Sequence, residues 1–380
     1  EAEVNGNDEN VMTLWKDVSG TWETAGKSGN SDSDNWVEFS MTDLSFNWTL
    51  SEGLTQRSWV GTNNSSWSNG NNWSPTGVPS VNSVVNIGDL VIVNQPIISN
   101  AVLAKEIYFY SDSPSVVTMA VGGSLTVQGN INGEWDADAT NTINVGAQNL
   151  TTYGDVVLSD GIAGREIDLV VSSGTVTVGG SLVLSGAADI SFSGAANLIV
   201  EGSFSRVAGS TFTPSTSTVT YSGTDLQQIA GVTYYNLVID KSSGLSVINT
   251  STDVTNDLTL SSGGQLDVQS SLTVTGDINI GSSTILNVPA ADVIDLGGNW
   301  DNLGSFFPGS GTVVFTGTSA QTTSASIFND FTINKSSGTL TLLGAVTLNG
   351  NIDVQSGTVE VDTYDVSRSV YGGEATLGAN

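Results

Sequence analysis

Two short segments of the chain carry acidic side chains at alternate positions, a pattern that could supply oxygen ligands to a divalent cation. Alternate residues of an extended strand point to the same face, so such carboxylates would converge on one ion, and Ca²⁺ prefers oxygen ligands of this kind. The first segment, residues 30–38, lacks the central Gly and the spaced Glu of an EF-hand. A solvated turn is the simpler interpretation of both segments. The candidate Ca²⁺ ligands are Asp32, Asp34 and Glu38 in the first segment and Glu134, Asp136 and Asp138, followed by Thr140, in the second.

The residue types that most often perform catalysis are scarce. The chain contains no His and no Cys, which excludes thiol chemistry and removes the commonest general base. A polysaccharide lyase on a β-helix would need Arg or Lys beside acidic residues, and a glycoside hydrolase would need paired carboxylates. Arg165, Arg206 and Arg368 lie apart from acidic clusters in the sequence. The sequence therefore predicts a protein without catalytic activity, and a carbohydrate-active enzyme is the alternative.

Three tryptophans, Trp59, Trp67 and Trp73, lie close together in the sequence. Aromatic rings can stack on sugar rings, so the cluster is a candidate carbohydrate site. Alternatively, the three rings could fill the open end of a β-structure and shield its unpaired edge. We expect the second role, so that residues 57–98 form a cap on the structure that follows.

The charge balance limits the partners of the protein. Among the 380 residues, 38 are Asp or Glu and only 9 are Lys or Arg, which gives a net charge of −29. Nucleic-acid binding needs several cations on one face, and so does binding to an anionic membrane, so neither is expected. No run approaches the ~20 apolar residues that span a bilayer, and we expect no membrane insertion. The charge favours solubility, and no cofactor other than Ca²⁺ is expected.

The elements that would position these residues are short β-strands. From about residue 57, runs such as 175–178 alternate Val, Leu or Ile with polar residues, which is the period of half-buried strands. Gly, Asn, Asp and Ser between the runs suit tight turns. Glycine spacing near twenty predicts roughly sixteen coils of a right-handed parallel β-helix over residues 57–380. A β-sandwich is the alternative, but its Asn-Gly hairpin signals do not recur with the period. Residues 1–56 are rich in Trp and acidic residues and predict a partial, antiparallel, β-sandwich-like domain.

An internal repeat supports this stacked architecture. Residues 218–263 recur without a gap as residues 312–357, at an offset of 94 residues. A fixed period of this kind is typical of stacked repeat folds. We therefore expect two repeats, at about 218–311 and 312–380.

A Lys-Ser-Ser-Gly turn occupies the same place in both copies, beginning at Lys241 and at Lys335. Because the offset is gapless, the two copies should follow the same backbone path. Ile239 and Ile333 each lie in an alternating strand just before this turn. We expect both isoleucines to be buried at equivalent core positions.

Several motifs give the chain a resemblance to the β-solenoid repeat regions of very large secreted surface proteins, or adhesins, of the Bacteroidota. The spaced tryptophans resemble the opening of those regions, and the 94-residue units resemble their repeats. The resemblance implies a structural or adhesive role, an extracellular location, a glycan or protein ligand, and export by the type IX route. The motifs that carry it are Trp59-Val60-Gly61, Trp67, Asn71-Asn72-Trp73, Gly77-Val78-Pro79, Asn299-Trp300, Thr312-Val313-Val314-Phe315 and the Lys-Ser-Ser-Gly turns.

The sequence thus predicts a non-catalytic, extracellular structural or adhesive repeat protein of the bacterial cell surface, as a fragment of a larger chain. The chain opens with Glu1 rather than Met, and residues 366–377 resemble the start of a further coil. An end at Asn380 would leave an open β edge, which we expect more of the chain or a second copy to occupy. A subunit of a surface filament that self-associates end to end is a further alternative.

Overall fold

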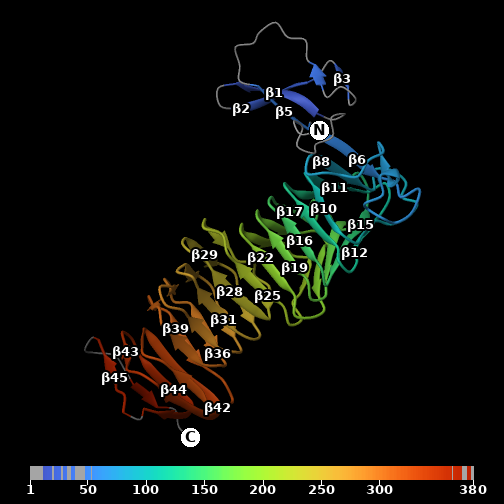
Figure 1. Cartoon of the computed structure of the whole chain (residues 1–380). Coiled ribbons are helices and arrows are strands. Elements are labelled where there is room, and N and C mark those ends of the chain that lie inside the picture. Colours follow the sequence, from blue (N-terminus) through green and yellow to red (C-terminus); the bar gives the residue numbers. More distant parts are fainter. Residues whose placement is uncertain are drawn as a thin grey trace.

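The computed structural model describes most of the chain, namely residues 12–18, 21–26, 29–31, 36–38, 48–52, 54–361, 363–369 and 375–377. In this described part, nearly every regular element is a short β-strand, and the only helical element is the 3₁₀ turn η1 (Gly70–Asn72). The strands stack in parallel as a β-solenoid of about 14 coils. Figure 1 shows the resulting elongated rod. The predicted all-β, parallel β-helix is confirmed.

Antiparallel strands precede the solenoid. The strand β1 (Met12–Val18) pairs antiparallel with both β2 (Thr21–Gly26) and β5 (Trp48–Glu52). A second antiparallel pair joins β3 (Gly29–Ser31) to β4 (Trp36–Glu38). The antiparallel character expected for this segment is therefore confirmed.

Tryptophans fill the first coil of the solenoid. The strand β6 (Thr55–Trp59) pairs antiparallel with β7 (Trp73–Ser74). The rings of Trp59, Trp67 and Trp73 are buried, with centroids 4.7 to 6.3 Å apart. The indole N–H of Trp59 donates to the carbonyl oxygen of Asn94 at 2.8 Å, as buried indoles usually do. Rings buried in this way are not available to stack on a sugar. The role of residues 57–98 as a cap stays a prediction.

Each coil contributes one strand to each of three faces, and along most of the rod a strand pairs with the strand three places later. In the last coils, from β40 on, the paired strands are two places apart. We name the faces after their first strands. The β8 face contains β8 (Ser83–Ile87), β11 (Glu106–Tyr110), β14 (Ile131–Glu134), β17 (Val156–Val157), β20 (Leu182–Leu184), β23 (Phe204–Arg206), β26 (Gln227–Gln228), β29 (Leu245–Ile248), β32 (Gln265–Val268), β35 (Ile285–Asn287), β38 (Ser305–Phe307), β41 (Ser326–Phe328), β43 (Val346–Leu348) and β45 (Val366–Arg368).

The other two faces run parallel to the first. The β9 face contains β9 (Ile97–Ile98), β12 (Val116–Met119), β15 (Ala139–Gly146), β18 (Arg165–Val171), β21 (Asp189–Phe192), β24 (Thr211–Thr213), β27 (Thr233–Tyr234), β30 (Thr252–Val254), β33 (Leu272–Val274), β36 (Val293–Leu296), β39 (Thr312–Phe315) and β46 (Ala375–Leu377). The β10 face contains β10 (Ala101–Ala104), β13 (Ser124–Val127), β16 (Asn149–Thr152), β19 (Thr175–Val178), β22 (Asn197–Val200), β25 (Thr218–Tyr221), β28 (Asn236–Asp240), β31 (Leu258–Ser261), β34 (Ile278–Ile280), β37 (Trp300–Asn302) and β40 (Gln321–Thr323). Two long strands, β42 (Asp330–Leu342) and β44 (Ile352–Glu360), pass from the β9 face to the β10 face.

The coils are uneven, and many are longer than the sequence suggested. Thr218 pairs with Asn236 across a short coil, whereas Asn149 pairs with Thr175 across a much longer one. The longer coils are the reason that the rod has about 14 of them and not sixteen. The expected alternation is present, because Val176 and Val178 point into a continuous apolar core while the threonines beside them point outward.

The 94-residue repeat is visible in the strand pairing. The strand β25 pairs with β28 as β39 pairs with β42, and β27 pairs with β30 as β41 pairs with β43, each at the same offset. Ile239 and Ile333 are both buried, with 1% and 0% exposure, which confirms their equivalence. Gly244 and Gly338 have φ of +87° and +76°, a conformation that favours glycine. The two copies therefore share their ladder pairings and their turn.

The repeat turns around the rod as it advances. It spans the 14 strands from β25 to β38 before β39 restarts the pattern. Because a coil holds three strands, 14 strands complete four and two-thirds coils. Equivalent strands therefore fall on different faces: β25 lies on the β10 face and β39 on the β9 face, while β27 lies on the β9 face and β41 on the β8 face. Each repeat is thus displaced from the last by one face.

Candidate functional site

The second acidic segment lies at a corner of the solenoid rather than on one strand. Glu134 ends β14 on the β8 face, residues 135–138 form the corner, and Ala139 begins β15 on the β9 face. One coil later, Arg165 pairs with Ala139 at the start of β18. The expectation that the alternating oxygens share one face of an extended strand is therefore wrong, because the chain bends between the two faces.

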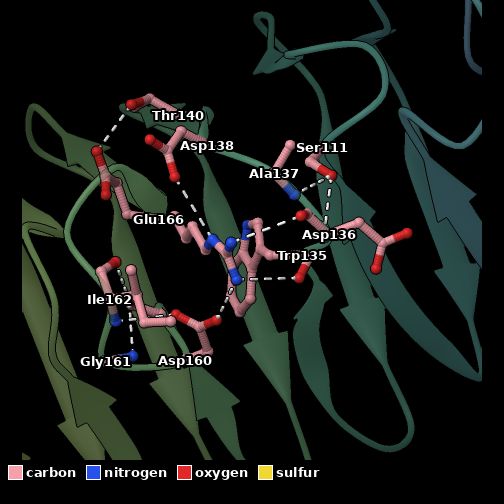
Figure 2. Close-up of polar contacts among 12 residues, drawn as sticks. Ser111, Trp135, Asp136, Ala137, Asp138, Thr140, Asp160, Gly161, Ile162 and Glu166 are labelled. Atoms are coloured by element: carbon pink, nitrogen blue, oxygen red, sulfur yellow. Dashed lines mark hydrogen bonds and ion pairs between the residues drawn. The ribbon is translucent and has the colours of Figure 1, made fainter.

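Arg165 lies at the centre of this corner. Its Nε is 3.5 Å from Oδ1 of Asp138, and its Nη1 is 3.4 Å from Oδ2 of Asp160. The same guanidinium donates to the carbonyl oxygens of Trp135 at 3.4 Å and Asp136 at 3.5 Å. Figure 2 shows Asp138 and Asp160 approaching from opposite sides. The sequence-based statement that Arg165 lies apart from acidic clusters is wrong, because stacking brings together residues of successive coils.

The environment of this arginine is partly exposed. The Arg165 side chain is 24% exposed, and that of Asp138 is 76% exposed. Ion pairs at such positions stabilise proteins by about 0–1 kcal/mol because water screens them. The backbone acceptors add positional order, since a planar guanidinium fixes several acceptors at once. The arrangement fastens the corner at 135–138 to the next coil.

A buried carboxylate lies beside this arginine in sequence. Glu166 is 7% exposed, and its Oε1 accepts a hydrogen bond from Oγ1 of Thr140 at 2.8 Å. Its second oxygen is buried and has no hydrogen-bond partner. Further along β18, burial raises the pKa of Asp168; the backbone N–H of Asp189 opposes the rise, and the charges of Asp189 and Glu166 add to it. This stretch of the β9 face therefore holds carboxylates at an energetic cost.

The predicted Ca²⁺ ligands have different outcomes. Asp32 and Asp34 lie outside the described residues, and only the backbone of Glu38 is described, in β4. The carboxylate of Asp136 points away from Asp138 in Figure 2, while its backbone N–H donates to Oγ of Ser111 at 3.2 Å. Within the described ranges, no three acidic side chains form a group that could hold a metal ion. Calcium binding stays a prediction.

Two buried lysines are a feature that sequence reasoning missed. Lys241 and Lys335 are 0% and 1% exposed, although each opens a polar turn. The amine of Lys241 donates to the carbonyl oxygens of Gly223 and of Asp225 (2.8 Å) and to Oε1 of Gln227 (2.7 Å). Burial lowers the pKa of Lys241, and the charge of Asp225 partly opposes this.

The second copy repeats this arrangement. Lys335 donates to the carbonyl oxygens of Gly317 at 2.6 Å and Ser319 at 2.9 Å, and to Oε1 of Gln321. Burial lowers the pKa of Lys335 as well. A Gln at the same distance before each Lys was the available signal, but nothing local marks the lysine as buried. The two lysines clamp a loop of the preceding coil and have a structural role.

The chain matches no protein-family model, no curated protein and no solved structure. The fold defines a parallel β-solenoid with an internal repeat, and the resemblance to Bacteroidota surface proteins rests on the sequence motifs alone. In the part of the chain that the structure describes, no helix has the length and apolar character needed to cross a membrane.

Proposed function

We propose that the protein is a non-catalytic structural or adhesive rod of the bacterial cell surface. The observation that carries this proposal is the uninterrupted apolar core, which runs through the coils from Trp59 to Leu348. A stacked fold of this kind gains length by adding coils, since each coil contacts only its neighbours. Such a fold provides length and exposed surface. The motifs that resemble those of secreted surface proteins support the extracellular location.

The polar clusters support the same function. The donors of Arg165 engage two carboxylates and two carbonyl oxygens of the chain itself, so they hold the corner together. Lys241 and Lys335 each satisfy three acceptors in the core. A general acid or base must reach a substrate proton, and buried clamps do not. These contacts within the chain support a structural role for the clusters.

The location is tested on intact cells. Brief protease treatment followed by mass spectrometry should release peptides of residues 218–263 while a cytoplasmic marker protein stays intact. A deletion strain should lose attachment to a surface or integrity of its extracellular matrix. Recovery of these peptides only after lysis would contradict the surface location. Export by the type IX route is tested separately, by blocking that route and following the same peptides.

A carbohydrate-active enzyme is the second candidate, and the Arg165 corner is the observation that favours it. Arg165 lies beside Asp138 and Asp160, and one carboxylate oxygen of the neighbouring Glu166 has no hydrogen-bond partner. These are the residue types of a lyase site. Incubation with acidic polysaccharides should release neither reducing ends nor unsaturated sugars. Release that the Glu166→Gln variant abolishes would establish the enzyme instead. A filament subunit is a third candidate, tested by the concentration dependence of sedimentation.

A further inference from the structure

A small cavity opens on the β9 face where its ladder is interrupted. The strand β24 pairs only with β21, and the ladder resumes with β27, which pairs with β30. The gap between β24 and β27 holds a cavity of about 280 Å³. It is lined by Arg206, Ser210, Thr211, Phe212, Thr233 and Asp253, among others. We call it the Arg206 cavity.

A cavity at the equivalent position occurs in the next repeat. On the β8 face, β38 pairs with β35 and the ladder resumes with β41, which pairs with β43. A cavity of about 400 Å³ lies there, which we call the Phe306 cavity. Its lining residues correspond to those of the Arg206 cavity at the 94-residue offset: Gly304, Ser305, Phe306, Ala325, Ser326, Ile327, Ala345 and Thr347.

The backbone around the two cavities also matches. Ser215 and Gly309, equivalent at this offset, have φ of +48° and +50°. A serine rarely adopts this conformation, so its occurrence at the equivalent position shows one shared loop shape. The cavity is therefore part of the repeat unit and begins upstream of the 218 boundary that the sequence suggested. The break between β24 and β27 recurs between β38 and β41, so it belongs to the repeat unit.

The chemistry of the two cavities differs. The Arg206 cavity carries a guanidinium and a carboxylate, from Arg206 and Asp253. At the equivalent positions the second repeat has Trp300, which is buried against Phe306 and Phe328, and Thr347. The position of the cavity in the repeat is thus retained, while the charged residues Arg206 and Asp253 are specific to the first copy.

The lining of the Arg206 cavity suits a small ligand that both donates and accepts hydrogen bonds. Arg206 supplies only donors and Asp253 only acceptors, and Nη2 of Arg206 is held at the cavity by the carbonyl oxygen of Ser210 at 2.7 Å. Hydroxyls of Thr211, Thr233 and Ser251 add groups of both kinds.

The ring of Phe212 and the charges in the cavity further limit the class of ligand that can bind. Phe212 packs against Phe192, Phe204 and Tyr234 at 5.6 to 5.9 Å, and is fixed as an apolar wall. Arg206 and Asp253 together give the cavity no net charge, and the whole chain carries −29. An anionic ligand is therefore disfavoured. A polyhydroxylated ring meets all of these conditions, since its hydroxyls donate and accept and its C–H faces contact aromatic rings.

We propose that the Arg206 cavity is a binding site for one neutral saccharide ring. Arg206 and Asp253 hydrogen-bond neighbouring hydroxyls, and Phe212 contacts the ring's C–H surface. The volume accommodates a ligand smaller than those of typical drug-sized pockets, which fits a single sugar residue. This inference deepens the adhesive part of the proposed function and rests on it, but a chain that binds no sugar could still form a surface rod.

The test is saturation-transfer NMR on the full chain with methyl glycosides of glucose, galactose, mannose and N-acetylglucosamine, each tested alone, and with alanine as a zwitterionic probe. At least one glycoside should bind, with a dissociation constant in the millimolar range. The Asp253→Thr variant should weaken this binding by about tenfold or more, because a ligand hydroxyl that loses its acceptor in the bound state opposes binding. This variant should fold, since Thr347 is the native residue of the equivalent strand.

A matched control is Asp295→Asn, which removes a carboxylate from the same face two coils further along and should leave binding unchanged. Arg206→Gln should weaken binding as Asp253→Thr does. The proposal is overturned if no glycoside binds, if alanine binds in place of the sugars, or if Asp253→Thr and Asp295→Asn have the same effect. Surface peptides from intact cells would test the rod function independently of these outcomes.

Discussion

Replacing Lys335 with Met tests the buried clamp most directly. The substitution keeps an unbranched side chain of similar length and removes the amine that serves Gly317, Ser319 and Gln321. A buried acceptor left without a donor costs about 1–3 kcal/mol. The substitution also removes the desolvation penalty of the buried charge, and this gain offsets part of the three losses. We expect the loop at 317–321 to lose about 2–4 kcal/mol of protection.

Hydrogen exchange of backbone amides measures this loss locally. A long stacked protein need not unfold in a single transition, so a single melting temperature would average the effect away. Peptides covering residues 316–322 should exchange about 30- to 700-fold faster in Lys335→Met, from a factor of ten for each 1.4 kcal/mol. Unchanged exchange in these peptides would refute the clamp.

The repeat supplies an internal control for this experiment. Lys241→Met removes the equivalent amine, so it should accelerate exchange at residues 222–228 and leave residues 316–322 unchanged. Lys105→Met removes the same charge at a partly exposed position, and it should accelerate neither loop. An equal response of both loops to all three variants would indicate a general effect of charge rather than a local clamp.

Three further predictions concern stability. Ile333→Asp places an unpaired charge in the core and should cost several kcal/mol, whereas the exposed neighbour Asn334→Asp should not; identical melting curves would contradict the core assignment. Burial raises the pKa of Asp168, so its contribution to stability is present below its unfolded pKa of about 3.9 and is lost as pH rises through the folded pKa. Asp168→Asn should therefore raise the melting temperature near pH 7 and change it little near pH 3, and equal shifts at both would contradict this. Millimolar Ca²⁺ should raise the melting temperature modestly relative to EDTA, as expected for binding to the native state; identical melting would exclude it.

Local pattern was sufficient to predict the strands and the repeat. Alternation of apolar and polar residues identified the half-buried strands, and the gapless offset identified Ile239 and Ile333 as equivalent. Both signals lie within a short stretch around each strand, and the hydrophobic core imposes them directly. The three-strand coil and its uneven length could not be predicted, because turn residues resemble one another whatever the size of the coil.

The polar clusters could not be predicted from the sequence, because their residues come together only when successive coils stack. The partners of Arg165 come from the preceding coil and from the corner before β18, so no local motif joins them. Lys241 looks like a surface residue in a Ser- and Gly-rich turn, and only the loop of the preceding coil converts it into a buried clamp. Likewise, the cavities require a missing ladder pairing, which is a relation between strands of neighbouring coils rather than a property of either strand.

Because each repeat contains 14 strands, successive repeats are related by a screw operation. Every repeat advances the rod by about 22 Å, from four and two-thirds coils at ~4.8 Å each, and rotates its features by one face of three. In a rod with three such repeats in series, equivalent features return to the same face only after about 67 Å. A flat substratum would then meet one repeat in three, while a flexible polymer wound around the rod could reach every repeat. The number of strands in each repeat would thus determine whether a flat or a flexible ligand can contact successive repeats.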